Sequence, residues 1–251
     1  MAVLSDRIEL HLDSAAPGEG DVASLYLPVV ELDVAEAARL RYIGVQALGP
    51  DAWQVGYCAS RTARDASLRT MAVALGGDYA RLRTDARMHG QGAYNELLAV
   101  YFGERAQMHD FRTIQDHAAP KSRSELIFKG AVTDKSSSVY SGLIRIAPEG
   151  KGSVANQTNR NLILSDDAAA ESVPNLEILN NDVKCSHASS VGPIDEDSRY
   201  YLESRGVPPD VAERLIVLGF FADLLDRIPD AEMVAQLIAA VAAKFQAGGS
   251  R

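Results

Sequence analysis

A thiol and an imidazole stand two residues apart in this 251-residue chain, at Cys185 and His187. The apolar run 176–179 precedes them, and if it continues as a β-strand, alternate side chains share one face. Val183, Cys185 and His187 would then point the same way. Thiolate and imidazole are ligands that iron and zinc sites use. Two ligands do not complete a metal shell, and a free cysteine often serves as a small buried apolar side chain, so both interpretations stay open.

The other motifs of well-known chemistry are missing from the sequence. Residues 150–153 place a glycine where a phosphate-binding loop needs a hydroxyl residue after the lysine, so we expect no nucleotide site of the chain's own. No Gly-x-Ser-x-Gly segment is present to hold a serine nucleophile. His89, His109 and His117 have no second ligand at strand or helix spacing, which favours structural roles. We therefore assign none of these motifs to the chain.

The charge of the chain argues against a nucleic-acid partner. The formal net charge is −9, and no long block of lysine and arginine offsets it locally. The only cysteines, Cys58 and Cys185, are too few for a disulfide framework, which favours a reducing compartment.

The sequence also predicts no membrane segment. Residues 1–13 show no basic region followed by an apolar run, so no secretory signal is expected. The longest apolar stretches, 215–225 and 237–245, are too short and too amphipathic to cross a bilayer. We therefore expect a soluble cytoplasmic protein.

The first three quarters of the chain carry short β-prone runs separated by turn residues. Such a pattern indicates a sandwich, barrel or solenoid, although no fixed sequence repeat is visible. Segment 157–161 (Gln-Thr-Asn-Arg-Asn) fits stacked polar turns or an ordinary polar loop. Segments 34–39 and 57–67 could be helical by propensity, but we assign them as β or loop. The runs are 25–32, 40–48, 68–75, 94–102, 126–132, 139–146, 162–164 and 176–178.

After Pro193 the pattern becomes helical. Asp195 can cap a short helix that ends near Gly206. Residues 208–210 can start a second helix, and Asp230 can cap a third. The third helix has one apolar stripe, formed by Met233, Leu237, Val241 and Phe245. We therefore divide the chain into a β-domain, 1–192, and a small C-terminal helical domain, 193–251.

The second predicted helix is unusually apolar. Its run 215–221 is wider than one helix face. Most amphipathic helices cover their own core, so the default expectation is that this helix packs on the β-domain. The extra width favours a second surface for a partner protein. The side chains proposed for that surface are Leu215, Leu218, Phe220 and Phe221.

Five separated blocks of the sequence, in the same order, resemble the SufB/SufD family of iron–sulfur cluster assembly scaffolds. The block around Cys185 and His187 resembles SufD members more than SufB members, which typically carry a glutamate-containing version. Residues 207–246 fit more loosely, and residues 1–109 resemble the family mainly in their general pattern of residue types. The blocks are 110–130, 157–165, 174–178, 182–187 and 201–206.

The resemblance implies a fold and a function. The fold would be mainly β, with a right-handed parallel β-helix followed by C-terminal helices. The chain would be a non-catalytic scaffold that pairs with a SufB-like paralogue and binds a SufC-like ATPase through its helices. ATP-driven dimerisation of that ATPase would open the junction between the paralogues, where a nascent cluster is built. His187, and Cys185 with less support, would be candidate ligands of a transient iron–sulfur cluster shared with the paralogue.

Two departures and two alternatives accompany this interpretation. After His187 the family usually continues with glycine, whereas Ala188 follows here. The N-terminal region of typical members is not matched, so we expect either a truncated piece of a longer protein or a short version of the family. One alternative is a β-helix enzyme acting on polysaccharides, which would need clustered carboxylates and a basic residue on a solvent-facing sheet. The other is a structural solenoid that forms a homodimer.

Overall fold

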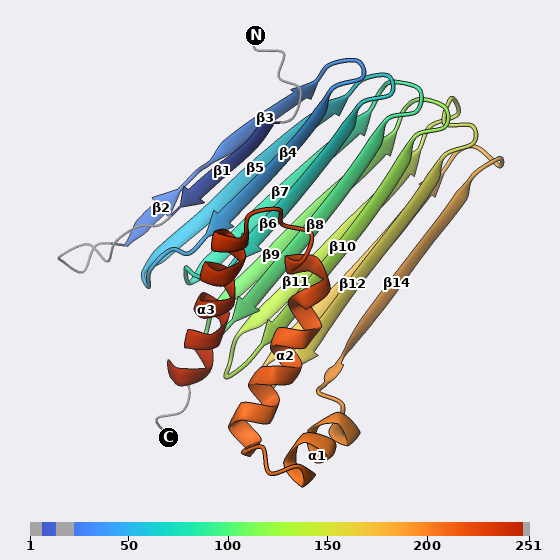
Figure 1. Ribbon diagram of the computed structural model, residues 1–251. Coiled ribbons are helices and arrows are strands. Elements are labelled where there is room, and N and C mark those ends of the chain that lie inside the picture. Colours follow the sequence, from blue (N-terminus) through green and yellow to red (C-terminus); the bar gives the residue numbers. More distant parts are fainter. Residues whose placement is uncertain (1–6, 14–22, 248–251) are drawn as a thin grey trace.

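The chain forms two parallel β-sheets that face one another, with helices against one of them (Figure 1). The computed structural model describes residues 7–13 and 23–247, with side chains for 23–245. Sheet A has the strand order β1-β4-β6-β8-β10-β12-β14, and sheet B has the order β13-β11-β9-β7-β5-β2, with β3 also paired to β5. The strands are β1 (Arg7–Asp13), β2 (Ser24–Tyr26), β3 (Val29–Val34), β4 (Arg39–Gln46), β5 (Ala52–Thr62), β6 (Ser67–Ala74), β7 (Tyr79–Met88), β8 (Tyr94–Gly103), β9 (Met108–His117), β10 (Arg123–Val132), β11 (Ser137–Ile146), β12 (Val154–Ile163), β13 (Ala169–Ile178) and β14 (Lys184–Pro193).

From β4 onward the chain is a parallel β-solenoid. Consecutive strands alternate between the two sheets, and each strand pairs in parallel with the strand one turn later. A parallel pair needs a crossover connection, and here a strand of the opposite sheet provides it. The predicted solenoid with C-terminal helices is confirmed.

One corner of the solenoid has a repeated backbone conformation. A residue with positive φ precedes each sheet A strand from β4 to β12 by two positions. Glycine adopts this left-handed region without steric cost, whereas other residues adopt it less readily. Only two of the five corner residues are glycine, so the corner is fixed by the fold around it and not by glycine alone. The five residues are Ala37, Asp65, Gly92, Lys121 and Gly152.

Aromatic side chains fill the interior between the middle strands. Tyr101, Phe111, Phe128 and Tyr140 are all buried, and Phe111 packs edge-on against Phe128 with ring centroids 5.5 Å apart. Gly130 lies beside Tyr101 in the strand register, and a Cβ at Gly130 would come within 2.0 Å of that ring. Glycine at 130 therefore makes room for the tyrosine.

The C-terminal helices are α1 (Glu196–Ser204), α2 (Pro209–Leu225) and α3 (Ala231–Ala247). Helices α2 and α3 cover the outer face of sheet A, and α1 packs against α2 (Figure 1). Strand β8 is buried on both faces because the solenoid interior lies on one side and these helices on the other. A hydrophobic cluster fills the space between sheet A and the helices. It joins the sheet residues Ile43, Met71, Leu98, Val100 and Phe102 to the helix residues Val217, Phe221, Leu224, Met233, Leu237 and Val241.

Two cations tie α2 and the residues after it to sheet A. Lys129 on β10 donates to the carbonyl oxygen of Phe220 at 2.8 Å and to Asp223 at 2.6 Å. Arg227 donates to Glu96 on β8 at 2.7 Å. Hydrogen bonds to charged groups are stronger than neutral ones, so these contacts fix the helix in position as well as stabilise it.

The helix predictions are confirmed. Asp195 is the N-cap of α1 and accepts the backbone N–H of Ser198, and Asp230 accepts the backbone N–H of Met233 at the start of α3. Pro209 begins α2 as expected. The predicted boundary between the domains at residue 193 stays a prediction, since the two parts share a hydrophobic cluster.

One prediction was wrong. Segment 157–161 lies within β12 and not in a turn. Its alternate residues Gln157, Asn159 and Asn161 point inward and are buried. The hydroxyl of Tyr101 donates to Asn161 Oδ1 at 2.6 Å and accepts from Asn159 Nδ2 at 3.2 Å. Asn159 and Asn161 are stable in this buried place because the tyrosine bonds both of them and Asn161 Nδ2 donates to Asn159 Oδ1 at 2.9 Å.

Candidate functional site

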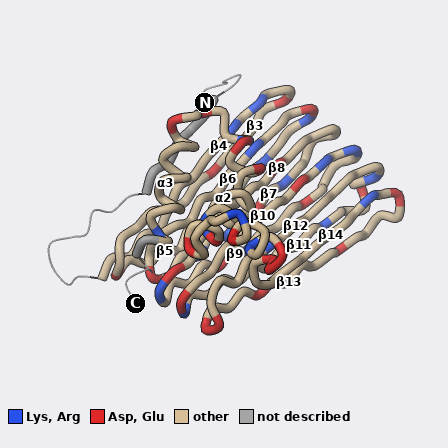
Figure 2. Tube along the Cα trace, turned by 60° about the horizontal axis from the view of Figure 1, so that its bottom comes forward, with Lys and Arg blue, Asp and Glu red and all other residues tan. Residues whose placement is uncertain are grey.

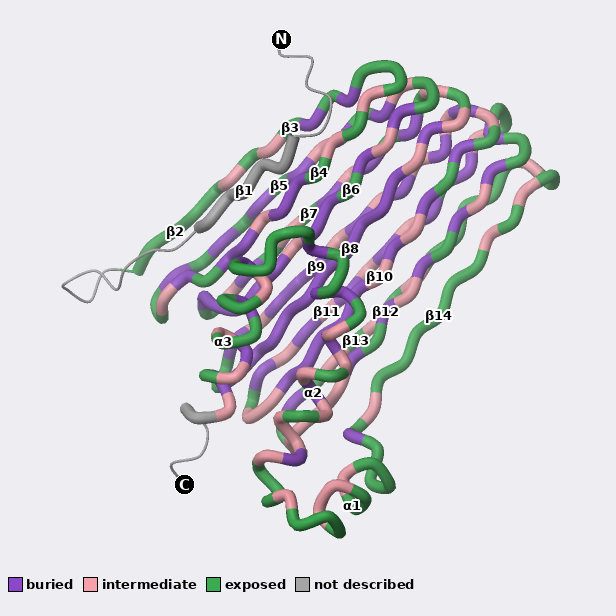
Figure 3. Tube along the Cα trace, viewed as in Figure 1, coloured by how far each residue is buried: buried purple, intermediate pink, exposed green. Residues whose placement is uncertain are grey.

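Cys185 and His187 lie on β14, the terminal strand of sheet A. Strand β12 is its one strand neighbour among the described residues. Figure 3 shows β14 as largely exposed, whereas β8 and β10 are largely buried. The register places Cys185 beside Ala155 and His187 beside Gln157, whose side chains face inward. Both candidate ligands therefore sit on the inward face of the last turn, and the predicted strand is confirmed.

The thiol of Cys185 is half-buried in a small apolar cluster. Together with Val183 it packs against Ile144, Ile146 and Ala155. Burial raises the pKa of the Cys185 thiol, so the thiol is protonated at neutral pH. Because the thiolate is the metal-binding form, a metal ion would have to displace that proton.

The imidazole of His187 is exposed, and it lies one strand away from a buried amide without a partner. Gln157 is 1% exposed, and neither its Oε1 nor its Nε2 has a hydrogen-bond partner within the described part of the chain. The hydroxyl of Ser172, on the opposite sheet, also has none there. A buried polar group without a partner is costly, so this end of the solenoid is polar without being internally satisfied.

Gln157 was missed as a possible functional residue in the sequence. Its Nε2 would lie 2.8 Å from a Cβ at Gly142, so the amide reaches toward sheet B beneath the last turn. The only sequence signal is the alternation of amides at 157, 159 and 161, which was interpreted as a turn. The same alternation also fits inward side chains of a strand.

The two donors form an incomplete ligand set. Strand geometry separates the Cα atoms of residues 185 and 187 by about 6.6 Å, so both side chains can approach one bound metal or cluster. Among the described side chains, no group of three or more histidine, cysteine, aspartate or glutamate residues is placed to hold a metal. Further ligands would have to come from another molecule.

The other histidines are not near β14 in the register of the strands. His117 is buried on β9, and its two ring nitrogens lie 2.8 Å from the hydroxyls of Ser122 and Ser124. Burial lowers the pKa of His117 to about 4 and that of His109 to about 3, so both are neutral. His89 is exposed in a turn. These positions agree with structural roles for His109 and His117.

The four side chains predicted to contact a partner are placed very differently on α2. Leu215 is 46% exposed, whereas Phe221 is fully buried in the chain's own core. Leu218 and Phe220 are partly buried against that core. Of the four, Leu215 is the one that presents a largely free surface.

Acidic and basic residues are interspersed along the strand ends and the helices (Figure 2). The lysines and arginines therefore form no single basic stripe in that view, which agrees with the negative net charge. Among the described helices, none is long and apolar enough to cross a membrane.

Comparison with known proteins identifies the family. A sequence model described as the SufBD core domain of the SUF system for FeS cluster assembly matches residues 5–220. The chain belongs to the SufBD family. It is a SufD-like member of this iron–sulfur cluster assembly family, as the sequence blocks predicted.

The relatives agree with this assignment. An iron–sulfur cluster assembly SufBD family protein of Mycobacterium bovis is 38% identical over 224 residues, which cover 86% of this chain and 56% of the relative. SufD of Escherichia coli is 28% identical over 251 residues (96% and 59%), and SufD of Bacillus subtilis is 33% identical over 159 residues (63% and 36%). The chain thus spans less than two thirds of the length of these relatives.

Proposed function

We propose that this chain is a non-catalytic scaffold that presents His187 to a nascent iron–sulfur cluster, with Cys185 as the secondary donor. The observation that carries the proposal is an exposed imidazole beside a half-buried thiol on the terminal strand of the solenoid. The cluster is the cargo of the SUF system to which the family belongs. Imidazole and thiolate are suitable ligands for iron in such a cluster.

A SufB-like paralogue supplies the missing ligands in this proposal. Strand β14 is a free edge of sheet A, and such an edge offers unpaired backbone groups to another strand. Val191 on the same strand and Ile178 on β13 are each about 40% exposed, which adds apolar surface near that edge. Docking there places the paralogue's own donors beside His187, and the bound cluster is transient because it is shared.

A SufC-like ATPase binds the helical part of the chain in this proposal. Leu215 of α2 and Tyr200 of α1 are exposed, at 46% and 73%, and α1 packs against α2. Phe221 contributes to this binding indirectly. Its buried side chain holds α2 on the solenoid and is not accessible to a partner. The ATPase brings the nucleotide site, so the scaffold needs none of its own.

The first experiment measures cluster assembly in the whole complex. The chain is co-expressed with a SufB-like paralogue and a SufC-like ATPase, purified without oxygen, and analysed for iron and acid-labile sulfide. We expect His187→Ala to assemble the same complex with at least fivefold less iron and sulfide. His89→Ala is the matched control, because His89 is an exposed histidine in a turn. Equal iron in wild type and His187→Ala would remove His187 from the site.

The second experiment measures the ATPase contact. We expect Leu215→Asp to release the SufC-like ATPase while the SufB-like paralogue stays bound. Ile238→Asp is the control, since Ile238 is an exposed apolar residue on α3 at 40%. Loss of the ATPase from both variants, or from neither, would contradict the assignment of α2.

The polysaccharide-active alternative has less support. Sheet B does carry carboxylates and arginines near one another on its outer face, around a shallow depression. Arg87 pairs with Asp116 at 3.5 Å, and Arg145 pairs with Glu177 at 3.7 Å. Carboxylates held in ion pairs along a sheet fit a surface ladder better than an acid–base pair for catalysis.

A further inference from the structure

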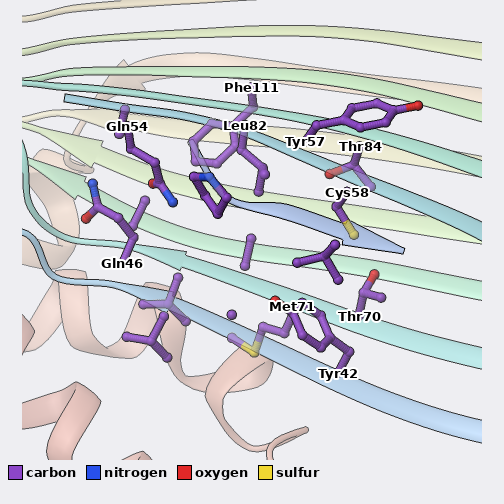
Figure 4. Close-up of a pocket in the computed structure, with 18 of the residues that line it drawn as sticks. Tyr42, Gln46, Gln54, Tyr57, Cys58, Thr70, Met71, Leu82, Thr84 and Phe111 are labelled. Atoms are coloured by element: carbon purple, nitrogen blue, oxygen red, sulfur yellow. The ribbon is translucent and has the colours of Figure 1, made fainter. Parts of the chain in front are cut away.

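The N-terminal turns of the solenoid form a cavity of about 240 Å³ between the two sheets, and this cavity is partly open to solvent. Strands β4, β6 and β8 form one wall, and β5, β7 and β9 form the other. Figure 4 shows Cys58, Leu82 and Phe111 among the side chains around it. Strands β10 and β12 of sheet A separate the cavity from β14.

The cavity arises from small residues in the inward columns of side chains. On sheet A, the strand register aligns Gly44, Ala72, Ala99 and Phe128 in one column. Side-chain volume therefore grows along this column from β4 to β10. Protein interiors are close-packed, so a column of glycine and alanine opposite another wall leaves a void.

Sheet B repeats the trend. The register aligns Gly56, Leu82, Phe111 and Tyr140 in its own inward column. Phe111 lies at the C-terminal end of the cavity and also belongs to the aromatic core. Side chains therefore fill the interior in the middle of the solenoid, whereas the interior of the earlier turns is hollow, although the backbone is the same.

Gly44 is not required by close packing, which distinguishes it from Gly130. The three atoms nearest to a Cβ at Gly44 all belong to Tyr42 and lie 3.4 Å or more away, whereas a Cβ at Gly130 would meet Tyr101 at 2.0 Å. A larger side chain at 44 thus has space to enter, and this space is the cavity itself.

The described lining residues are mostly apolar and carry no charge. Lysine, arginine, aspartate and glutamate are absent from the described lining residues. Burial raises the pKa of the Cys58 thiol to about 11, so it is neutral as well. Gln46 uses both ends of its amide on the backbone of Gly76, which leaves the apolar groups to face the space.

We propose that this cavity binds a neutral, apolar small molecule of about the size of a single aromatic ring or a short branched hydrocarbon. An engineered apolar cavity of about 150 Å³ stays dry and binds benzene, and the present one is larger. A charged or strongly polar molecule would lose its hydration without gaining partners. Pro28, Val29 and Val30 border the cavity at the start of β3.

The test uses benzene as the probe and the free chain as the receptor. Leucine methyl signals are followed by NMR during a benzene titration, and the signal of Leu82 is identified from its loss in Leu82→Val. We expect a saturable shift of the Leu82 methyl signals in the wild type. Gly44→Val fills the cavity and is expected to weaken binding at least tenfold.

Ala59→Val is the matched control, because residue 59 lies on the outer face of β5 and is not among the lining residues. It is expected to bind benzene as the wild type does. Ala72→Leu fills the same space from β6 and replaces Gly44→Val should that variant not fold. Absence of a saturable shift in the wild type, or equal binding by the filled variants, would overturn the proposal. Because no Suf partner is present, this test is independent of the proposed assembly function.

Discussion

The middle and the last turn of the solenoid use strands of the same length but have opposite interiors. Strands β8 and β14 each span ten residues of sheet A. The inward side of β8 ends in Tyr101, which is fully buried in an aromatic cluster. The equivalent side of β14 carries Cys185 and His187, and the latter is exposed. The comparison shows that an inward residue becomes part of the buried core only where a further turn of the solenoid covers it.

The largest expected effect lies in the middle turn. Phe128→Ala removes a fully buried ring from the aromatic cluster. We expect the free energy of unfolding to fall by about 3–5 kcal/mol, as for other buried phenylalanines. Urea denaturation followed by circular dichroism measures it. A loss below about 1 kcal/mol would mean that the aromatic interior is loosely packed and that the comparison of the two turns fails.

The pH dependence of the free energy of unfolding tests the burial of His117. The pKa of buried His117 is about 4, below the ordinary value near 6.5, so the unfolded chain binds more protons between these values. Stability from this residue is complete above about pH 6.5 and falls by about 1.4 kcal/mol per pH unit toward pH 4. We expect His117→Gln to reduce the slope of unfolding free energy against pH by about that amount.

Urea denaturation at a series of pH values measures this slope. An unchanged slope in His117→Gln would show that His117 does not lose its proton on folding, against its burial in the structure.

A smaller effect is expected where the helices meet sheet A. Lys129→Met keeps the length of the side chain but removes the donor to Phe220 and Asp223. We expect a loss of about 1.5–3 kcal/mol, since these are charge-assisted hydrogen bonds in a largely buried place. Lys135→Met, at an exposed turn residue, is the control. Equal stability of the two variants would mean that Lys129 does not fix α2.

The smallest effect is expected at the candidate site itself. His187→Ala should change the free energy of unfolding by no more than about 0.5 kcal/mol, because the side chain is exposed on a terminal strand. The same urea denaturation measures it. A loss comparable to that of Phe128→Ala would identify His187 as a core residue instead of a ligand.

Much of the fold could be predicted from the sequence, and the parts that could not have physical reasons. Continuous apolar runs such as 97–102 predicted strands correctly because both faces of β8 are buried. Strand β7 was missed because its inward residues include the small side chains Ala80, Thr84 and Ala86, which form no apolar run.

The repeat was also invisible in the sequence. The corner residues with positive φ are of four types, and they recur at intervals of 28, 27, 29 and 31 residues. A structural repeat held by backbone conformation needs neither a constant residue type nor a constant interval. The solenoid therefore had to come from the resemblance to the family, whereas sequence periodicity left three β architectures open.

The candidate site was predicted only in part. The alternation of residues placed Cys185 and His187 on one face, and that is how β14 displays them. The residues around Gln157 in the sequence did not indicate that its amide is unpaired beneath His187. The burial of Gln157 depends on how strands β11 and β12 meet across the interior. The burial of Phe221 likewise depends on how α2 docks, which the width of its apolar run did not reveal.

Hydrogen exchange at the backbone of β14 tests most directly whether the last turn is completed by a second protein. In the free chain, we predict fast exchange for β14 amides without a partner strand, and slow exchange for β8, which is paired on both sides. Adding the SufB-like paralogue should slow β14 at least tenfold while β8 is unchanged. Unaltered exchange at β14 in a complex that has formed would contradict the account, since the paralogue would then bind elsewhere.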